Sequence, residues 1–112
     1  MDCIFCKLAN KEIPTEVVYE DEYVFAFNDL DPKAPYHILF VPKKHINSNN
    51  EVEEDDQIIS RIFSAIRKVA KEKGFDKTGY RIVNNIGEDG GQSVFHIHFH
   101  VMAGRKMLWP AG

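Results

Sequence analysis

The segment His96-Ile97-His98-Phe99-His100-Val101-Met102 carries three histidines that alternate with large apolar residues. A repeat of two residues is the repeat of a β-strand, so the imidazoles are predicted to project from one face and the apolar side chains from the other. An apolar face is what a strand needs to pack into a core. A row of side chains that titrate near neutral pH is not needed for folding, so this face is predicted to carry the chemistry.

Apolar and aromatic runs on either side of this segment predict the remaining strands. Residues 17–28, interrupted by an acidic stretch, predict a hairpin of two strands. The near-continuous apolar run over 36–41 ends at Pro42 and predicts a central strand. The rest of the sheet is expected as a fourth strand over 79–86, a glycine-rich loop over 87–92 and the histidine strand over 93–103.

Helical periodicity predicts one long helix over residues 51–73, followed by Gly74 as its stop. Acidic residues crowd its expected start and basic residues its end, which would complement the helix dipole. A short helical turn is expected over residues 3–10. The predicted fold class is therefore α+β, an antiparallel sheet of about five strands with the long helix on one face. Because the long helix covers only one face, the face that carries the histidines is predicted to form the floor of a cleft.

The composition is that of one ordinary globular domain spanning residues 1–112, with 44% hydrophobic and 28% charged residues. A net charge of −3 argues against charge-driven binding to nucleic acid or a membrane surface. The N-terminus has no signal-peptide pattern and no segment could span a bilayer, so a cytoplasmic protein is expected. In that compartment Cys3 and Cys6 are expected as half of a metal site or as free thiols.

Three interpretations of the histidine row compete. The histidines could be ordinary polar residues on a wet strand face. They could bind one metal, but alternate residues of a straight strand lie ~6.7 Å apart, which separates His96 from His100 too widely. The third interpretation is covalent catalysis, in which neutral His98 attacks phosphorus while neighbouring imidazoles donate protons.

An anion cradle is needed for the third interpretation, and the loop before the histidines is the candidate. Gly90-Gly91 can expose consecutive backbone N–H groups. Asn85, Gln92 and Ser93 would add neutral hydrogen-bond donors.

The histidine segment resembles the signature of the histidine triad (HIT) family of nucleotide hydrolases and transferases. Further segments resemble its Hint branch: Ile4-Phe5, Lys11-Glu12-Ile13-Pro14, Ala34-Pro35-Tyr36-His37, Pro42-Lys43-Lys44-His45, Gly90-Gly91-Gln92-Ser93-Val94 and Trp109-Pro110. The resemblance implies the HIT fold, with a five-stranded antiparallel sheet, one long helix and a short N-terminal helix. It also implies a homodimer, in which the tail carrying Trp109 reaches toward the partner's active site.

The resemblance also implies roles for individual residues. His98 would be the nucleophile that is transiently nucleotidylated, supported by His100, His96 and His37. Asn85 and Ser93 would contact the phosphate or the leaving group, with Gln92 and Val94 beside them. Asp29 would hold the ribose hydroxyls. The purine pocket would be lined by Phe5, Leu8, Phe27 and Leu30.

The pair Cys3-x-x-Cys6 allows a redox function, two inert thiols or half of a structural zinc site. His45 and His96 are the remaining candidate ligands, and some bacterial proteins that resemble this one carry zinc on such a set. Four protein ligands leave no open position on the ion, so this zinc is expected to be structural and not catalytic. His96 would then be less available for catalysis.

The expected function is hydrolysis of a purine nucleoside 5′-phosphoramidate, such as adenosine 5′-phosphoramidate, or of an aminoacyl-adenylate-like compound. The purine nucleotide is the expected small-molecule partner, and neither nucleic acid nor a membrane is expected. Three alternatives stay open: a dinucleoside-polyphosphate hydrolase, a nucleotide-binding sensor or interaction module, and a hydrolase with a catalytic metal on His98 and His100.

Overall fold

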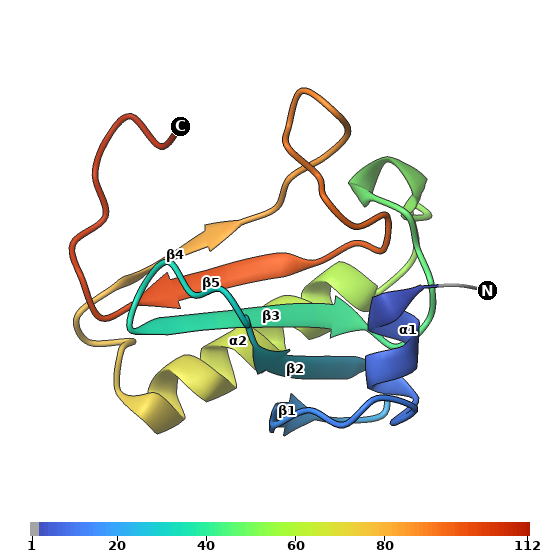
Figure 1. Cartoon of the computed structure of the whole chain (residues 1–112), viewed down its shortest axis with the longest axis horizontal. Coiled ribbons are helices and arrows are strands. Elements are labelled where there is room, and N and C mark those ends of the chain that lie inside the picture. The colour runs from blue at the N-terminus through green and yellow to red at the C-terminus, as the bar shows by residue number, and fades with distance from the viewer. Residues whose placement is uncertain (1–2) are drawn as a thin grey trace.

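A five-stranded antiparallel sheet with strand order β1-β2-β3-β5-β4 forms the centre of the structure, a computed structural model that describes residues 3–112 (Figure 1). This confirms the α+β prediction. The short helix at the N-terminus and the central position of the third strand are confirmed as well. The elements in chain order are α1 (Ile4–Ala9), β1 (Val17–Glu20), β2 (Val24–Asn28), β3 (Tyr36–Pro42), the 3₁₀ turn η1 (Asn49–Glu51), α2 (Ile58–Lys73), β4 (Tyr80–Val83) and β5 (Phe99–Ala103).

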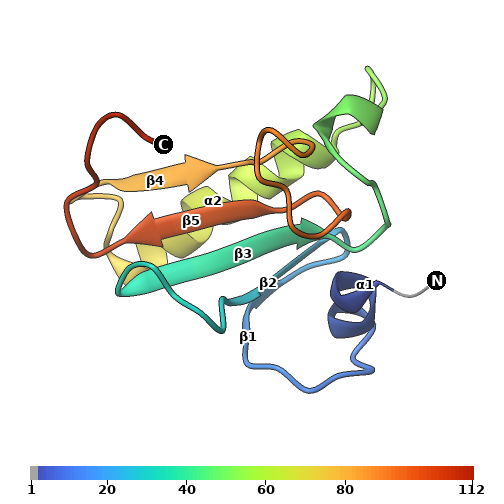
Figure 2. The ribbon, with the colours of Figure 1, turned by 45° about the horizontal axis from the view of Figure 1, so that its top comes forward.

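The two faces of the sheet are covered unequally. Helix α2 packs across one face, and α1 lies against the opposite face near the ends of β2 and β3 (Figures 1 and 2). Ile97, Phe99 and Val101 are buried on the α2 side, as the alternation predicts. The strand residue paired with His100 is Leu39, which is buried in the α1-side cluster. The imidazoles and α1 therefore share one face.

Helix α2 begins later than predicted, at Ile58 instead of residue 51. Its apolar stripe starts at Ile58, and the Asp56 carboxylate accepts a hydrogen bond from the Ile58 N–H at 2.9 Å. The acidic residues therefore precede the helix, and none lies in its first turn. The predicted stop is correct, because Gly74 adopts φ +88° and its N–H donates to Ala70 O.

The predicted fourth and fifth strands are too long. β4 covers only Tyr80–Val83, and β5 begins at Phe99 instead of residue 93. The chain bends over residues 94–96, and the Ile97 N–H donates to Ile46 O at 2.7 Å instead of to a neighbouring strand. His96 and His98 thus precede the regular strand, and only His100 lies within it. The distance argument based on a straight histidine strand does not hold for this segment.

Among residues 3–112 no helix is long and apolar enough to cross a membrane.

Candidate active site and metal centre

His98 is held in one orientation by its own backbone neighbourhood. Its Nδ1–H donates to the carbonyl of His96 at 2.9 Å, which leaves the lone pair on Nε2. The side-chain amide of Asn84 donates to the His98 carbonyl at 2.9 Å, just after the point where β4 ends. The ring and the backbone of this residue are therefore both fixed.

The remaining nitrogen of His98 opens onto a pocket. Only 3% of the residue is exposed, but the ring contributes to the wall of a cavity of about 240 Å³. Nε2 has no hydrogen-bond partner among the described residues. Every fully buried side-chain nitrogen or oxygen of those residues does have a partner, so Nε2 is not fully buried. Nε2 is therefore the accessible atom of an otherwise buried ring. A neutral imidazole with its proton on Nδ1 and its lone pair on Nε2 is a competent nucleophile.

A hydrogen-bonded relay places a donor beside this nucleophile. The backbone N–H of Lys33 donates to His37 Nδ1 at 3.0 Å, so the proton of neutral His37 is on Nε2. That Nε2–H lies 2.9 Å from His100 Nδ1 and donates to it. The proton of His100 is consequently on Nε2, which has no partner among the described residues. The rings of His98 and His100 are adjacent, with centroids 5.1 Å apart.

Burial keeps these imidazoles neutral. It lowers the pKa of His37 and of His98 below the usual histidine value. Burial, helped by the neighbouring His98 and His37, lowers the pKa of His100 to about 4. At neutral pH the site therefore presents one free lone pair and one free N–H.

The pocket around His98 has apolar walls and one carboxylate. Asp29 is half-buried, accepts a hydrogen bond from the Asp31 N–H at 2.8 Å and lies 3.4 Å from His37 Nε2. Ser93 contributes a hydroxyl that has no partner among the described residues. The complete lining is Ile4, Phe5, Leu8, Phe27, Asp29, Leu30, Leu39, Ser93, His98 and His100. Ile4 and Leu39 were not among the predicted pocket residues.

Two backbone amides of the glycine-rich loop, those of Gly91 and Gln92, are hydrogen-bonded within the loop and are not free to bind an anion. The N–H of Gly91 donates to Glu88 O, and that of Gln92 donates to Gly87 O, each at 3.0 Å. The Gln92 side chain is also engaged: it accepts from the Gly87 N–H within the loop and donates to Asn47 O and Val94 O outside it. Gly90 is required sterically, because a Cβ there would collide with the backbone of Ile86. The three hydrogen bonds of the Gln92 side chain thus fix the shape of the loop that precedes Ser93.

Three other predicted residues lie outside this pocket. Val94 packs against the α1-side cluster, and Asn85 is half-buried beyond the pocket wall. Trp109 is 84% exposed in the C-terminal tail, at the end of the sheet opposite α1 (Figure 1).

The structure also identifies supporting residues that the sequence did not reveal, namely Asn84, Asn47 and the backbone of Lys33. Asn84 and Lys33 act through one hydrogen bond each, and Asn47 acts through its side chain and its carbonyl, so no motif marks them.

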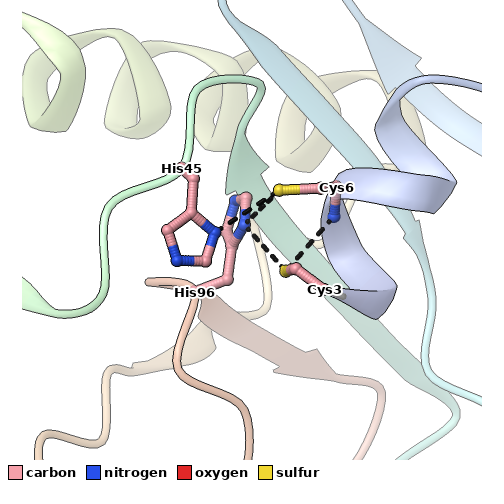
Figure 3. A group of neighbouring side chains, drawn as sticks. All are labelled: Cys3, Cys6, His45 and His96. Atoms are coloured by element: carbon pink, nitrogen blue, oxygen red, sulfur yellow. Dashed lines mark hydrogen bonds between the residues drawn. The ribbon is translucent and has the colours of Figure 1, made fainter. Parts of the chain in front are cut away.

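A second histidine cluster lies at the N-terminal part of α1. The ligand atoms of Cys3, Cys6, His45 and His96 all lie within 4.8 Å of one another (Figure 3). The Cys3 thiol lies 3.4 Å from His96 Nδ1, and the Cys6 thiol lies 3.4 Å from His45 Nδ1 and 3.5 Å from His96 Nδ1. A tetrahedral ion with bonds of ~2.3 Å to sulfur and ~2.0 Å to nitrogen separates S and N by roughly 3.5 Å. The four predicted ligands therefore match the dimensions of a zinc site.

Outer hydrogen bonds orient both histidines of this cluster as ligands. His96 Nε2–H donates to Pro42 O at 2.8 Å, and His45 Nε2–H donates to Asn47 Oδ1 at 2.8 Å. Each ring consequently directs the lone pair of Nδ1 toward the thiols. This is the second shell that metal-binding histidines usually have. Burial also lowers the pKa of His96 to about 4, which keeps the ring unprotonated.

A larger hollow, of about 580 Å³, lies at the start of α2. Its ionic side chains are partly engaged with one another, as in the 2.6 Å pair of Lys44 with Asp56. It contains neither histidine nor cysteine. The smaller pocket, which contains His98 and His100, is therefore the better candidate active site.

The fold and the histidine site define the class of this protein. A model of the HIT domain matches residues 10–107, and the chain belongs to the HIT family, as its resemblance predicted. The 14 kDa zinc-binding protein of Brassica juncea is 45% identical over 114 residues, which cover 99% of this chain and 100% of the relative.

Solved structures with the same fold include a HIT family hydrolase from Legionella pneumophila Philadelphia 1. It is 46% identical with a TM-score of 0.96, over 99% of this chain and 100% of that one. A histidine triad protein from Clostridium difficile is 59% identical with a TM-score of 0.94, over 96% of this chain and 95% of that one.

Proposed function

We propose that this protein hydrolyses purine nucleoside 5′-phosphoramidates through a covalent nucleotidyl intermediate on His98. The observation that carries the proposal is the orientation of one ring. His98 donates through Nδ1 to a backbone carbonyl and directs its free Nε2 lone pair into the pocket. The names of its structural relatives, HIT family hydrolase among them, support a hydrolytic reaction.

In the first step His98 Nε2 attacks the α-phosphorus. The new N–P bond forms in line with the P–N bond that breaks. The departing amine takes up a proton supplied by the Ser93 hydroxyl or by a neighbouring histidine. The His100 Nε2–H stabilises the charge that develops on a phosphoryl oxygen, since a preorganised donor is most effective there. A P–N bond suits this site because the protonated amine is a good leaving group.

In the second step water attacks the same phosphorus. The bond from phosphorus to His98 Nε2 breaks, the water gives a proton back to the group that protonated the amine, and the nucleoside monophosphate leaves. Neutral His98 is restored with its proton still on Nδ1. The net reaction consumes one water and yields AMP and ammonia or an amine when the nucleoside is adenosine.

The pocket walls support a nucleoside as the bound group. Phe5, Leu8, Phe27 and Leu30 provide the apolar surface on which a base would pack, and Asp29 provides a carboxylate for the ribose hydroxyls. His96, in contrast, turns its Nδ1 lone pair away from the pocket toward the thiols. Its proposed contribution to catalysis is the carbonyl that orients His98.

We propose further that Cys3, Cys6, His45 and His96 hold a structural zinc ion. The donor set, the separations near 3.5 Å and the outer hydrogen bonds of both rings support this assignment. The Brassica juncea relative is named for zinc binding. With four protein ligands the ion would fix the N-terminal helix and would not meet substrate.

The proposed assembly is a homodimer, consistent with the family resemblance. β4 lies at the edge of the sheet, and Leu108 and Trp109 are 72% and 84% exposed. A partner that covers this edge would bury both. The cytoplasmic location remains our proposal, since a reducing compartment keeps the two cysteines available as metal ligands.

Hydrolysis assays with two substrates test the proposed function. We expect adenosine 5′-phosphoramidate to be cleaved far faster than diadenosine polyphosphates, and expect activity to persist after treatment with a chelator. Preference for the polyphosphates would assign the dinucleotide hydrolase instead. Tight AMP binding without turnover would assign a nucleotide sensor, and complete loss of turnover on chelation would assign a catalytic metal.

A further inference from the structure

We infer that the Cys/His metal cluster is a positioning element of the nucleotide pocket, acting through Phe5 and the backbone of His96. The inference rests on the proposed function and deepens it. It predicts that metal binding and nucleotide binding are coupled, although the ion itself does not touch the nucleotide.

Helix α1 is only six residues long, and together with its N-cap it contributes residues to both the metal cluster and the nucleotide pocket. Cys3 is its N-cap and Cys6 lies in its first turns, so both thiols of the metal set belong to it. Ile4, Phe5 and Leu8 of the same helix line the pocket. An isolated helix this short is unstable in water, so its position depends on what holds it to the sheet.

Phe5 joins the two sites physically. It lies between the two cysteines in the chain and is 6% exposed. Its ring meets the ring of His98 edge-on, with centroids 5.0 Å apart and planes at 79°, and meets that of His96 at 5.9 Å and 77°. One aromatic side chain therefore packs against a metal-ligand histidine and against the nucleophile.

His96 provides a second connection. Its Nδ1 faces the thiols, while its carbonyl accepts the Nδ1–H of His98. An ion that fixes the His96 ring also restricts the backbone that carries this carbonyl. Loss of the ion frees α1 on one side of His98 and loosens its orienting carbonyl on the other.

Coupling of this kind is reciprocal. If the ion raises the affinity for nucleotide by some factor, the nucleotide must raise the affinity for the ion by the same factor. Couplings between sites usually amount to about fivefold or more. A purely stabilising ion, remote from the pocket, would change neither affinity in the folded protein.

Calorimetric titration of AMP into zinc-loaded and zinc-stripped protein tests the first half of this prediction. We expect at least about fivefold weaker binding to the stripped form. Release of zinc to a chelating dye tests the other half, with the effect of free AMP on the dye subtracted. Saturating AMP is expected to shift the equilibrium of that release toward bound zinc by the same factor.

Two variants separate coupling from loss of structure. Phe5→Leu keeps an apolar side chain and all four metal ligands, and we expect it to bind zinc while the AMP effect on zinc release shrinks. Leu30→Ala is the matched control, because Leu30 lines the pocket but lies outside α1 and is 98% exposed. It should weaken AMP binding equally with and without zinc.

Equal AMP affinity for loaded and stripped protein, with hydrolysis intact, would overturn the inference and leave the proposed function standing. Failure of AMP to bind either form would overturn both. If stripping unfolds the whole chain, zinc release from Phe5→Leu decides: an undiminished AMP effect in that variant overturns the inference.

Discussion

The two histidine clusters of this protein both adjoin α1 and are built from the same side chain, yet their ring nitrogens are oriented for different chemistry. In the metal cluster, His45 and His96 each donate Nε2–H to an oxygen and direct an Nδ1 lone pair at the thiols. In the pocket, a backbone N–H of Lys33 sets the protonation of His37, which in turn sets that of His100.

This difference argues against metal binding by a second group of potential ligands. Asp29, His37 and His100 also present ligand atoms within 4.8 Å of one another. A metal on His37 Nε2 would leave the proton of neutral His37 on Nδ1, where it would face the Lys33 N–H. The hydrogen-bond partner of the second ring nitrogen therefore decides whether a histidine binds metal or handles protons.

Replacing the nucleophile should have the largest effect. His98→Asn removes the attacking nitrogen, and we expect phosphoramidate hydrolysis to fall by about 10⁴-fold or more. AMP binding and the zinc content, by calorimetry and elemental analysis, should remain. Substantial hydrolysis by this variant would show that the two clusters had been assigned the wrong roles.

Replacing one histidine of each cluster by alanine should affect different properties: catalytic rate in one case, and zinc content and KM in the other. We expect His100→Ala to lower kcat by about 10²-fold, because a preorganised hydrogen-bond donor to the phosphoryl oxygen is lost, and to retain zinc. His45→Ala should lose zinc and raise KM while changing kcat much less. Steady-state kinetics with elemental analysis would check both, and equal kcat losses would remove the distinction between the clusters.

Weakening the outer shell of the metal cluster should have a smaller effect. Asn47 is exposed and contacts His45 through its side chain. We expect Asn47→Ala to reduce zinc affinity by about 10–100-fold in competition titrations, since the outer partners of ligating histidines have effects of that size. An unchanged zinc affinity would contradict the role assigned to this hydrogen bond.

Lowering the pH should reduce the free energy of unfolding through the buried histidines of the pocket, and it should do so over a broad pH range. The pKa of His100 is lowered from 6.5 to about 4 in the folded protein, so the unfolded chain binds its proton first as the pH falls. The contribution of His100 to the free energy of unfolding should therefore be constant above pH 6.5 and decrease between pH 6.5 and about pH 4. Denaturant titrations across this range would show a shallower decrease for His100→Gln.

The sequence predicted the fold and the histidine face well because both depend on local periodicity. Alternation over residues 96–102 correctly separated Ile97, Phe99 and Val101 from the imidazoles. It could not show that β5 begins at Phe99, because the bend before it depends on contacts with distant segments, such as the Ile97 N–H to Ile46 O bond.

The errors elsewhere have the same origin. The acidic stretch before Ile58 has the charge pattern of a helix start, but its one apolar residue, Val52, packs against the core from outside the helix, and the apolar stripe begins only at Ile58. The backbone amides of the glycine-rich loop were expected to be free, but those of Gly91 and Gln92 bond within the loop. Composition shows which donors a loop contains and not whether the loop uses them itself.

Rapid-quench mass spectrometry of the protein mixed with adenosine 5′-phosphoramidate tests the central claim most directly. We predict a transient adenylyl adduct that maps to His98, is absent from His98→Asn, and disappears as AMP accumulates. Turnover without any adduct, or an adduct on another residue, would contradict the account.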